Sequence, residues 1–267
     1  LTSVAAAAAA VVLFAAPVIG TRSQLVAGLV GCLLVQLVFV GSWVFGTRRP
    51  GPLVVAAVGI GSGVVADLYA AYGPAVSLAS FGYVLAGGLI AGAAGQLARG
   101  RRRERVTESL CATMVAVVGA VAVPAVTVLD RHGHGAAVVT ALLVACGVAV
   151  LLARLTDVLW SLPRASSQVP RGIPGILVGG VLGATVAGFV AGMLGDLSGW
   201  RTALAALVVG LAAVFSDIGV SFGTAGALAA GEPRPGWPAR FLLGPATAVT
   251  VVAPACYVLG VLVLLPT

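Results

Sequence analysis

The sequence predicts an all-α, polytopic membrane helix bundle, and its composition carries that prediction. Hydrophobic residues make up 60% of the chain, charged residues make up 9%, and the mean hydropathy is +1.13. A soluble fold of this composition would expose apolar surface on every side, whereas lipid solvates helices that are apolar all round. The chain contains no lysine, and its 15 cationic residues are arginines that fall almost entirely between long apolar runs.

Apolar windows of about 17 to 25 residues, the length that crosses a bilayer core, can be marked off nine times. They lie near residues 4–20, 25–46, 53–72, 76–98, 110–129, 136–155, 173–195, 202–222 and 241–265. The gaps between them are too short for a soluble domain, so we expect one integral membrane domain over residues 1–267. The 37 glycines and 14 prolines fit this class, because neighbouring membrane helices satisfy the backbone groups that proline frees.

The first window, Val4 to Gly20, is short and alanine-rich, and no basic residue precedes it. A cleaved signal peptide normally begins with a basic region. We therefore expect a retained helix, with a cleaved signal peptide as the alternative.

The arginines predict the orientation of the bundle, because cytoplasmic loops carry an excess of basic residues. One alternating set of loops holds 12 of the 15: Arg48, Arg49, Arg99, Arg101, Arg102, Arg103, Arg105, Arg154, Arg164, Arg171, Arg234 and Arg240. The other set holds Arg22, Arg131 and Arg201. This places the N-terminus in the cytoplasm and the C-terminus outside.

The same distribution of arginines accounts for the pI of about 10.1, so we infer no nucleic-acid partner. The Arg99–Arg105 cluster would also attract anionic headgroups.

The composition indicates the kind of organism that the chain comes from, and the positions of the cysteines indicate their role. Abundant Ala, Val, Gly and Arg without Lys or Asn indicates a GC-rich bacterial genome, which predicts a multi-pass protein of the bacterial inner membrane. The cysteines lie inside apolar windows without CxxC spacing, which favours packing over metal binding or disulfides. They are Cys32, Cys111, Cys146 and Cys256.

Small-residue stripes predict where helices approach closely. Gly175, Gly179 and Gly183 recur at four-residue spacing, and shorter glycine pairs occur at 59/63 and 88/92. We expect these stripes to pack helices within the bundle; a self-association surface is the alternative.

Three of the eight acidic residues lie within or at the ends of membrane windows: Asp67, Asp157 and Asp217. A charge at the centre of a bilayer costs at least about 2.5–3.5 kcal/mol, so such a residue has a partner or a function. Asp157 and Asp217 lie toward the predicted cytoplasmic ends of their segments, where they would share one cavity. They would bind Mg²⁺ or a cationic group, or each would pair with an arginine such as Arg154 or Arg240. Asp67 lies toward the opposite side.

No other motif carries a strong chemical signal. His132 and His134 share one predicted outer loop, but a metal site needs more ligands than these two. No P-loop, HExxH or GxSxG pattern is present.

The second half of the chain resembles the CDP-diacylglycerol synthase (phosphatidate cytidylyltransferase) family in three segments. Leu155-Thr-Asp-Val-Leu-Trp resembles a family segment with a Ser-Asp pair. The segment Val169-Pro-Arg-Gly-Ile-Pro-Gly-Ile-Leu-Val-Gly-Gly resembles the family's Ser-Pro-Lys-Lys-Thr-Trp-Glu-Gly, which an apolar pair and Gly-Gly follow. The run from Leu207 to Asp217 resembles the apolar stretch that opens the family signature. The likeness extends from about residue 53 to the end, and nine helices would agree with a bacterial member.

Several residues that the family's chemistry needs are replaced. Arg171 stands for the first lysine, and Asp217 and Ser221 keep their register. Gly175 stands where the family has Glu, and Gly244 to Thr247 contains no carboxylate where a closing acidic element is expected. The signature's basic and acidic positions fall at Thr224, Ala225, Ala230 and Gly231, with Glu232 one residue off, and its His-Gly-Gly stretch falls at Ala239-Arg-Phe. Moving a cytidylyl group between two polyanions needs metal ions and cations, so these losses bear on activity.

The resemblance and its departures predict a non-catalytic relative that acts as a scaffold or accessory subunit in the bacterial envelope. It would bind a membrane lipid or, more readily, another membrane or envelope protein, and the family implies a homodimer. The vestigial cavity would be lined by Asp157, Arg171, Asp217 and Ser221, with Arg164 and Arg240 near an anionic headgroup. No cofactor is expected. One alternative is an active cytidylyltransferase that holds Mg²⁺ with Asp157 and Asp217; another is a transporter or flippase-type protein with Asp67 in its pathway.

Overall fold

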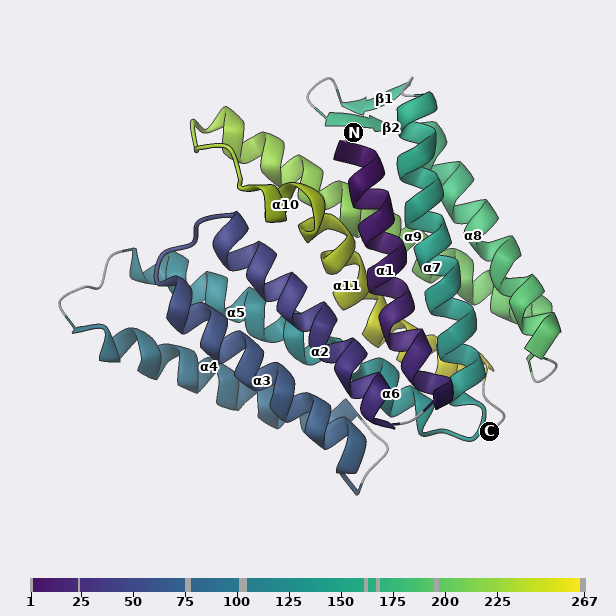
Figure 1. The fold of residues 1–267 in the computed structure, drawn as a ribbon, viewed down its shortest axis with the longest axis horizontal. Helices are drawn as coiled ribbons and strands as arrows, with labels where there is room; N and C mark the ends of the chain where they lie inside the picture. Colours follow the sequence, from purple (N-terminus) through teal and green to yellow (C-terminus); the bar gives the residue numbers. More distant parts are fainter. Residues whose placement is uncertain are drawn as a thin grey trace.

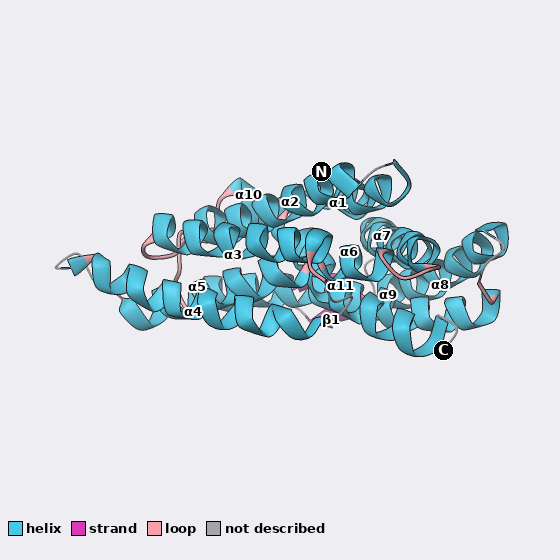
Figure 2. Ribbon diagram, turned by 90° about the horizontal axis from the view of Figure 1, so that it is seen from below, coloured by secondary structure: helices cyan, strands magenta, loops and turns pink. Residues whose placement is uncertain are grey.

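A computed structural model describes residues 2–23, 25–74, 78–100, 105–160, 163–166, 169–194 and 197–264. Helices make up almost all of this part of the chain, and one antiparallel two-stranded hairpin joins two of them (Figure 2). Eight helical segments of the described residues are long and apolar enough to cross a membrane. The architecture is therefore that of a polytopic membrane helix bundle.

The elements follow the predicted windows closely. They are α1 (Thr2–Ser23), α2 (Leu25–Gly41), the π-helical turn η1 (Ser42–Gly46), α3 (Pro52–Tyr72), η2 (Leu78–Ser80), α4 (Phe81–Ala98), α5 (Val106–Ala122), α6 (Ala125–Asp130), α7 (Gly135–Leu159), β1 (Arg164–Ser166), β2 (Val169–Gly172), α8 (Ile173–Leu194), α9 (Gly199–Ala229), α10 (Trp237–Phe241), α11 (Leu243–Leu259) and η4 (Gly260–Leu264). The described apolar part of α1, Ala8–Val18, is shorter than a span, so a ninth crossing stays a prediction. The hairpin, and the extension of α9 beyond residue 222, were not predicted.

The helices form two groups joined by a central helix (Figure 1). Helices α2, α3, α4 and α5 pack together on one side, while α1, α7, α8 and α9 pack on the other. Helix α11 runs between the groups and contacts members of both, and α1 also packs on α2. Large side chains from both groups, among them Phe14, Val35 and Leu142, meet in one buried core.

A proline and a glutamine shape the junction between α5 and α6. Pro124 has no N–H, so it cannot donate to the carbonyl of Ala120 four residues earlier, and the helix breaks there. Gln36 on α2, which is fully buried, donates its Nε2–H to that carbonyl at 3.2 Å. A side chain from a neighbouring helix therefore satisfies the freed group, as membrane bundles require.

The glycine stripe of α8 lies against α7. A Cβ atom added at Gly175, Gly179 or Gly183 would stand 2.7, 2.5 or 2.9 Å from the carbonyl oxygens of Ala153, Ala149 and Ala145, respectively. Those carbonyls also recur every four residues, so the two backbones run in contact over two helical turns. The stripe therefore packs helices within one chain, as expected.

The described chain begins and ends at opposite ends of the bundle. Helix α1 begins at the end where the hairpin β1–β2 and α10 lie (Figure 1). Gly260, near the end of the chain, packs against Leu129 and Val138 at the other end. We call the first end the arginine-rich end, because Arg48, Arg49, Arg105 and Arg234 gather there around one pocket. Its assignment to the cytoplasm stays a prediction.

Candidate functional site

Asp217 on α9 forms an ion pair with Arg154 on α7. The two side chains are almost entirely buried, with 2% and 6% of the residue surface exposed, respectively. Gly244, near the start of α11, packs on the pair: an added Cβ would overlap Asp217 Oδ1 and lie 2.7 Å from the Arg154 guanidinium. Three helices thus meet at a charge pair that has no room for a larger residue at position 244.

Asp157 has a different environment, although it lies only three residues from Arg154 on α7. Its Oδ1 accepts a hydrogen bond of 2.8 Å from the backbone N–H of Gly172. Gly172 directly precedes α8, so the carboxylate lies at the positive end of that helix dipole. An added Cβ at Gly175 would stand 2.6 Å from the same oxygen. Asp157 therefore anchors the hairpin and the first turn of α8 to α7.

Asp157 and Asp217 each contact another group of the protein. Asp217 Oδ1 faces a guanidinium, Asp157 Oδ1 faces a backbone N–H, and glycines occupy the adjoining positions 175 and 244. In the described ranges, no group of three or more His, Cys, Asp and Glu side chains is placed to hold a metal ion. Mg²⁺ takes six oxygen ligands, of which the protein commonly supplies one or two carboxylates while waters and substrate phosphates supply the rest.

The other predicted site residues have simpler surroundings. Ser221 donates to the backbone carbonyl of Asp217 at 3.4 Å, a bond within α9. Arg240 is exposed, and its guanidinium lies 5.9 Å from the ring of Phe241. The side chains of Arg164 and Arg171 lie outside the described part of the structure.

Asp67, the third intramembrane carboxylate, is buried within α3, which runs unbroken from Pro52 to Tyr72. Gln36 lies on the neighbouring α2 and also contacts the backbone of α3 at Gly63. A transporter pathway is expected to run through broken helices, and the helix that carries Asp67 is continuous.

His132, from the predicted outer loop, packs its ring against the ring of Tyr257, with 5.9 Å between the ring centres.

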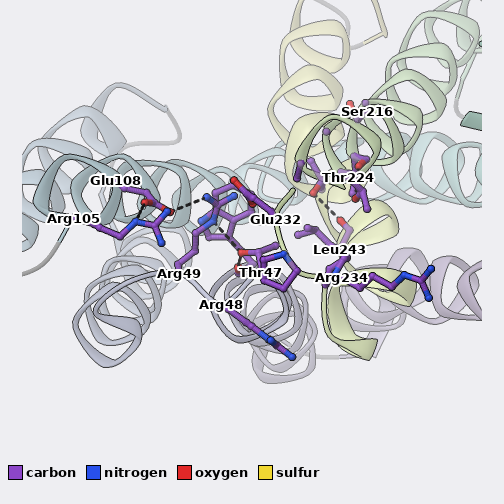
Figure 3. Close-up of a pocket in the computed structure, with 18 residues that line it drawn as sticks. Thr47, Arg48, Arg49, Arg105, Glu108, Ser216, Thr224, Glu232, Arg234 and Leu243 are labelled. Carbon is purple, nitrogen blue, oxygen red and sulfur yellow. Dashed lines mark hydrogen bonds and ion pairs between the residues drawn. The ribbon is translucent and has the colours of Figure 1, made fainter. Parts of the chain in front are cut away.

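A pocket of about 460 Å³ lies at the arginine-rich end, between the two helix groups. Its polar side chains come from the loop after η1, the region where α5 begins, the second half of α9, the following loop and the start of α11. Figure 3 shows Arg49, Arg105 and Glu108 gathered on one side, while the side chains of Arg48 and Arg234 extend outward. Neither Asp157, Asp217 nor Ser221 is among the described residues that line it. The lining consists of Trp43, Thr47, Arg48, Arg49, Arg105, Glu108, Ser216, Gly219, Val220, Gly223, Thr224, Ala227, Glu232, Pro233, Arg234, Pro235, Leu243 and Thr247.

One side of the pocket is a compact ionic cluster around Arg49 (Figure 3). The Arg49 guanidinium lies 3.6 Å from the carboxylate of Glu108, which Arg105 also contacts at 2.5 Å. Arg49 further donates to the hydroxyl of Thr47 at 3.0 Å and lies 4.5 Å from the ring centre of Trp43. The side chain of Arg49 is thus held by contacts on several sides.

A short backbone contact closes the other side. The N–H of Gly236 donates to the carbonyl of Gly46 at 2.8 Å, which ties the loop after α9 to the end of η1. Gly46 leaves room for this approach, since an added Cβ would stand 2.6 Å from the backbone nitrogen of Ala239. The loop that carries Glu232 and Arg234 is therefore fixed over the pocket.

The pocket was not predicted from the sequence. One feature of the sequence did point toward it: the loops that carry Arg48, Arg49, Arg105 and Arg234 lie on the same predicted side of the membrane. That pattern predicts a shared end of the bundle, but it does not predict which loops meet.

Comparisons of the chain with protein-family models, curated proteins and solved structures found no match.

Proposed function

We propose that this chain is a non-catalytic membrane protein of the bacterial inner membrane, with a scaffold that resembles CDP-diacylglycerol synthase. It would act by binding a lipid headgroup or another membrane or envelope protein. The observation that carries the proposal is the buried ion pair between Arg154 and Asp217. Asp217 is the acidic residue that keeps its register in the resemblance, and here a guanidinium neutralises it.

Glycines at two further positions support the same proposal. The resemblance would place carboxylates at or near Gly175 and Gly244, and these glycines pack directly on Asp157 and Asp217. A side chain at either position would overlap a neighbouring aspartate in the present packing. Cytidylyl transfer needs metal ions and cations around a triphosphate. At these positions of this chain, glycines pack on the aspartates and Asp217 pairs with Arg154, which supports the proposal.

The test is a turnover assay with CTP, phosphatidic acid and Mg²⁺ on the purified protein, with a known active synthase as positive control. We expect no CDP-diacylglycerol above the level of a protein-free reaction. Turnover that Asp217→Asn abolishes would overturn the proposal and favour the active cytidylyltransferase. A contaminating synthase is recognised because its turnover would survive Asp217→Asn.

A further inference from the structure

We propose that the pocket at the arginine-rich end binds an anionic phospholipid whose headgroup carries hydroxyl groups, of the phosphatidylglycerol type. The inference rests on the lipid-binding part of the proposed function. It adds to it a location, a ligand class and a set of contact residues that lie apart from Asp157 and Asp217.

The size and lining of the pocket suit an amphiphile. Its volume, about 460 Å³, falls within the range of about 300–1,000 Å³ that small-molecule sites occupy. Trp43, Val220 and Leu243 supply an apolar wall from the membrane helices. The charged side chains come from loops and helix ends and form a polar rim (Figure 3). A ligand with a charged head and an apolar body matches both parts.

The charge of the rim favours an anion. Four arginines line the pocket against two glutamates, Glu108 and Glu232, which leaves a net charge of +2 (4 − 2). Glu108 is engaged by Arg49 and Arg105. Arg48 and Arg234 are exposed and make no ion pair with another described residue, so their guanidinium groups remain available to a phosphate. A guanidinium group can donate two parallel hydrogen bonds to a phosphate. Basic pockets between membrane helices bind anionic lipid headgroups.

The hydroxyl groups of the lining favour a headgroup that donates hydrogen bonds. Ser216, Thr224 and Thr247 each donate to a helix carbonyl four residues earlier, at 2.7, 2.8 and 2.7 Å, respectively. With the proton in that bond, each hydroxyl oxygen offers its lone pairs to a donor on a ligand. A glycerol headgroup supplies donors to them, whereas the phosphate of phosphatidic acid supplies few. This difference predicts a preference between two anionic lipids.

Two glycines on α9 provide a way to block the pocket without changing its charge. An added Cβ at Gly219 or Gly223 would meet no atom within 4 Å, although both residues line the pocket. A leucine at Gly223 would extend into the space proposed for the lipid. Gly226 lies on the same helix, is equally open and does not line the pocket, which makes Gly226→Leu a matched control.

The experiment measures dissociation constants of the full chain in detergent for short-chain phosphatidylglycerol, phosphatidic acid and phosphatidylcholine. Free sn-glycerol 3-phosphate is the fourth probe. We expect phosphatidylglycerol to bind at least tenfold more tightly than phosphatidylcholine and more tightly than phosphatidic acid, and the free ester to bind more weakly still. Equal binding of the free ester would overturn the lipid assignment, and equal binding of phosphatidic acid would overturn the role of the hydroxyl acceptors.

Variants then test the location. We expect Gly223→Leu to weaken phosphatidylglycerol binding at least tenfold and Gly226→Leu to leave it unchanged. Arg48→Gln and Arg234→Gln should each weaken it roughly fivefold, the value of one surface charge near a lipid phosphate. Arg240→Gln removes the same charge from the same end but outside the pocket. If Arg240→Gln weakens binding as much, or Gly223→Leu not at all, lipid attraction is diffuse and the proposed site is wrong.

The two proposals fail separately. If the lipid preference is not found, the non-catalytic role can still hold, because the turnover assay tests it independently. If CDP-diacylglycerol is produced, the non-catalytic role is wrong whether or not the pocket binds lipid.

Discussion

Arg154 on α7 and Asp217 on α9 neutralise each other inside a bundle of apolar helices. A lone charge at such a site has neither water nor a counter-ion, whereas a hydrogen-bonded pair keeps much of its electrostatic energy. The pair therefore explains how a chain with so few charged residues accommodates two of them in its interior. It also links the two helices that flank α8 in the sequence.

Removing one member of the pair should destabilise the bundle. We expect Asp217→Asn to lower the free energy of unfolding by about 3–5 kcal/mol, because it leaves the Arg154 guanidinium buried without its counter-charge. Unfolding by SDS titration in mixed micelles measures this change.

The double variant Arg154→Met/Asp217→Asn separates the pair from other effects of each substitution. We expect it to be less destabilised than the sum of the two single variants, since neither charge remains buried. Additive single effects would show that the two side chains contribute independently and would contradict the pairing.

The packing of Gly244 on this pair predicts a position intolerant of any side chain. An added Cβ would overlap Asp217 Oδ1, so Gly244→Ala should cost about 1–3 kcal/mol through overpacking. Gly226→Ala is the control, because its Cβ would enter open space on α9, where alanine favours the helix by up to about 1 kcal/mol. Equal stability of the two variants in the same SDS titration would count against the contact.

Hydropathy alone predicted the helices well, because each bilayer-spanning segment must satisfy its backbone internally and therefore forms a long apolar helix. The window at 53–72 became α3, Pro52–Tyr72, and that at 173–195 became α8, Ile173–Leu194. The hairpin between α7 and α8 was missed, because its strands, Arg164–Ser166 and Val169–Gly172, are too short and polar for a clear alternating pattern.

The sequence predicted some residues of the site, but it did not predict which of them contact each other. The sequence allowed Asp217 to pair with Arg154, but Arg240 was an equal alternative, and the choice depends on how α7, α9 and α10 pack. The pocket depends on contacts far apart in the chain, such as the hydrogen bond from Gly236 to Gly46. No periodicity encodes such a contact, so it could not be read from one sequence.

Gln36 and Pro124 should show thermodynamic coupling, although they lie on different helices. Gln36→Leu leaves the carbonyl of Ala120 without its donor, and we expect a loss of about 1–3 kcal/mol. In a Pro124→Ala background, residue 124 regains an N–H that can donate to the same carbonyl, so Gln36→Leu should cost less. The same cost in both backgrounds would assign the role of Gln36 to its other contacts.

The close packing of α7 on α8 predicts position-specific effects within one helix. Gly179→Ala brings a methyl group to 2.5 Å from the carbonyl of Ala149, so the helices must separate at a cost of about 1–3 kcal/mol. Gly192→Ala, on the same helix but facing open space, should be neutral or slightly stabilising. Thermal unfolding of both variants in nanodiscs measures the difference, and a destabilised Gly192→Ala would mean that helix propensity or lipid contact dominates instead.

The predicted orientation can be tested with a membrane-impermeant maleimide in a bacterial host. Glu232→Cys lies at the arginine-rich end, and Gly133→Cys lies in the loop after α6. The maleimide should therefore reach the two cysteines from opposite sides of the membrane. Each is made with Cys111→Ser, since Cys32, Cys146 and Cys256 are buried and Cys111 is exposed. We expect Gly133→Cys to react in intact spheroplasts and Glu232→Cys only in inverted vesicles, because positive loops are retained in the cytoplasm. The reverse pattern would invert the bundle and would place the proposed lipid pocket in the outer leaflet.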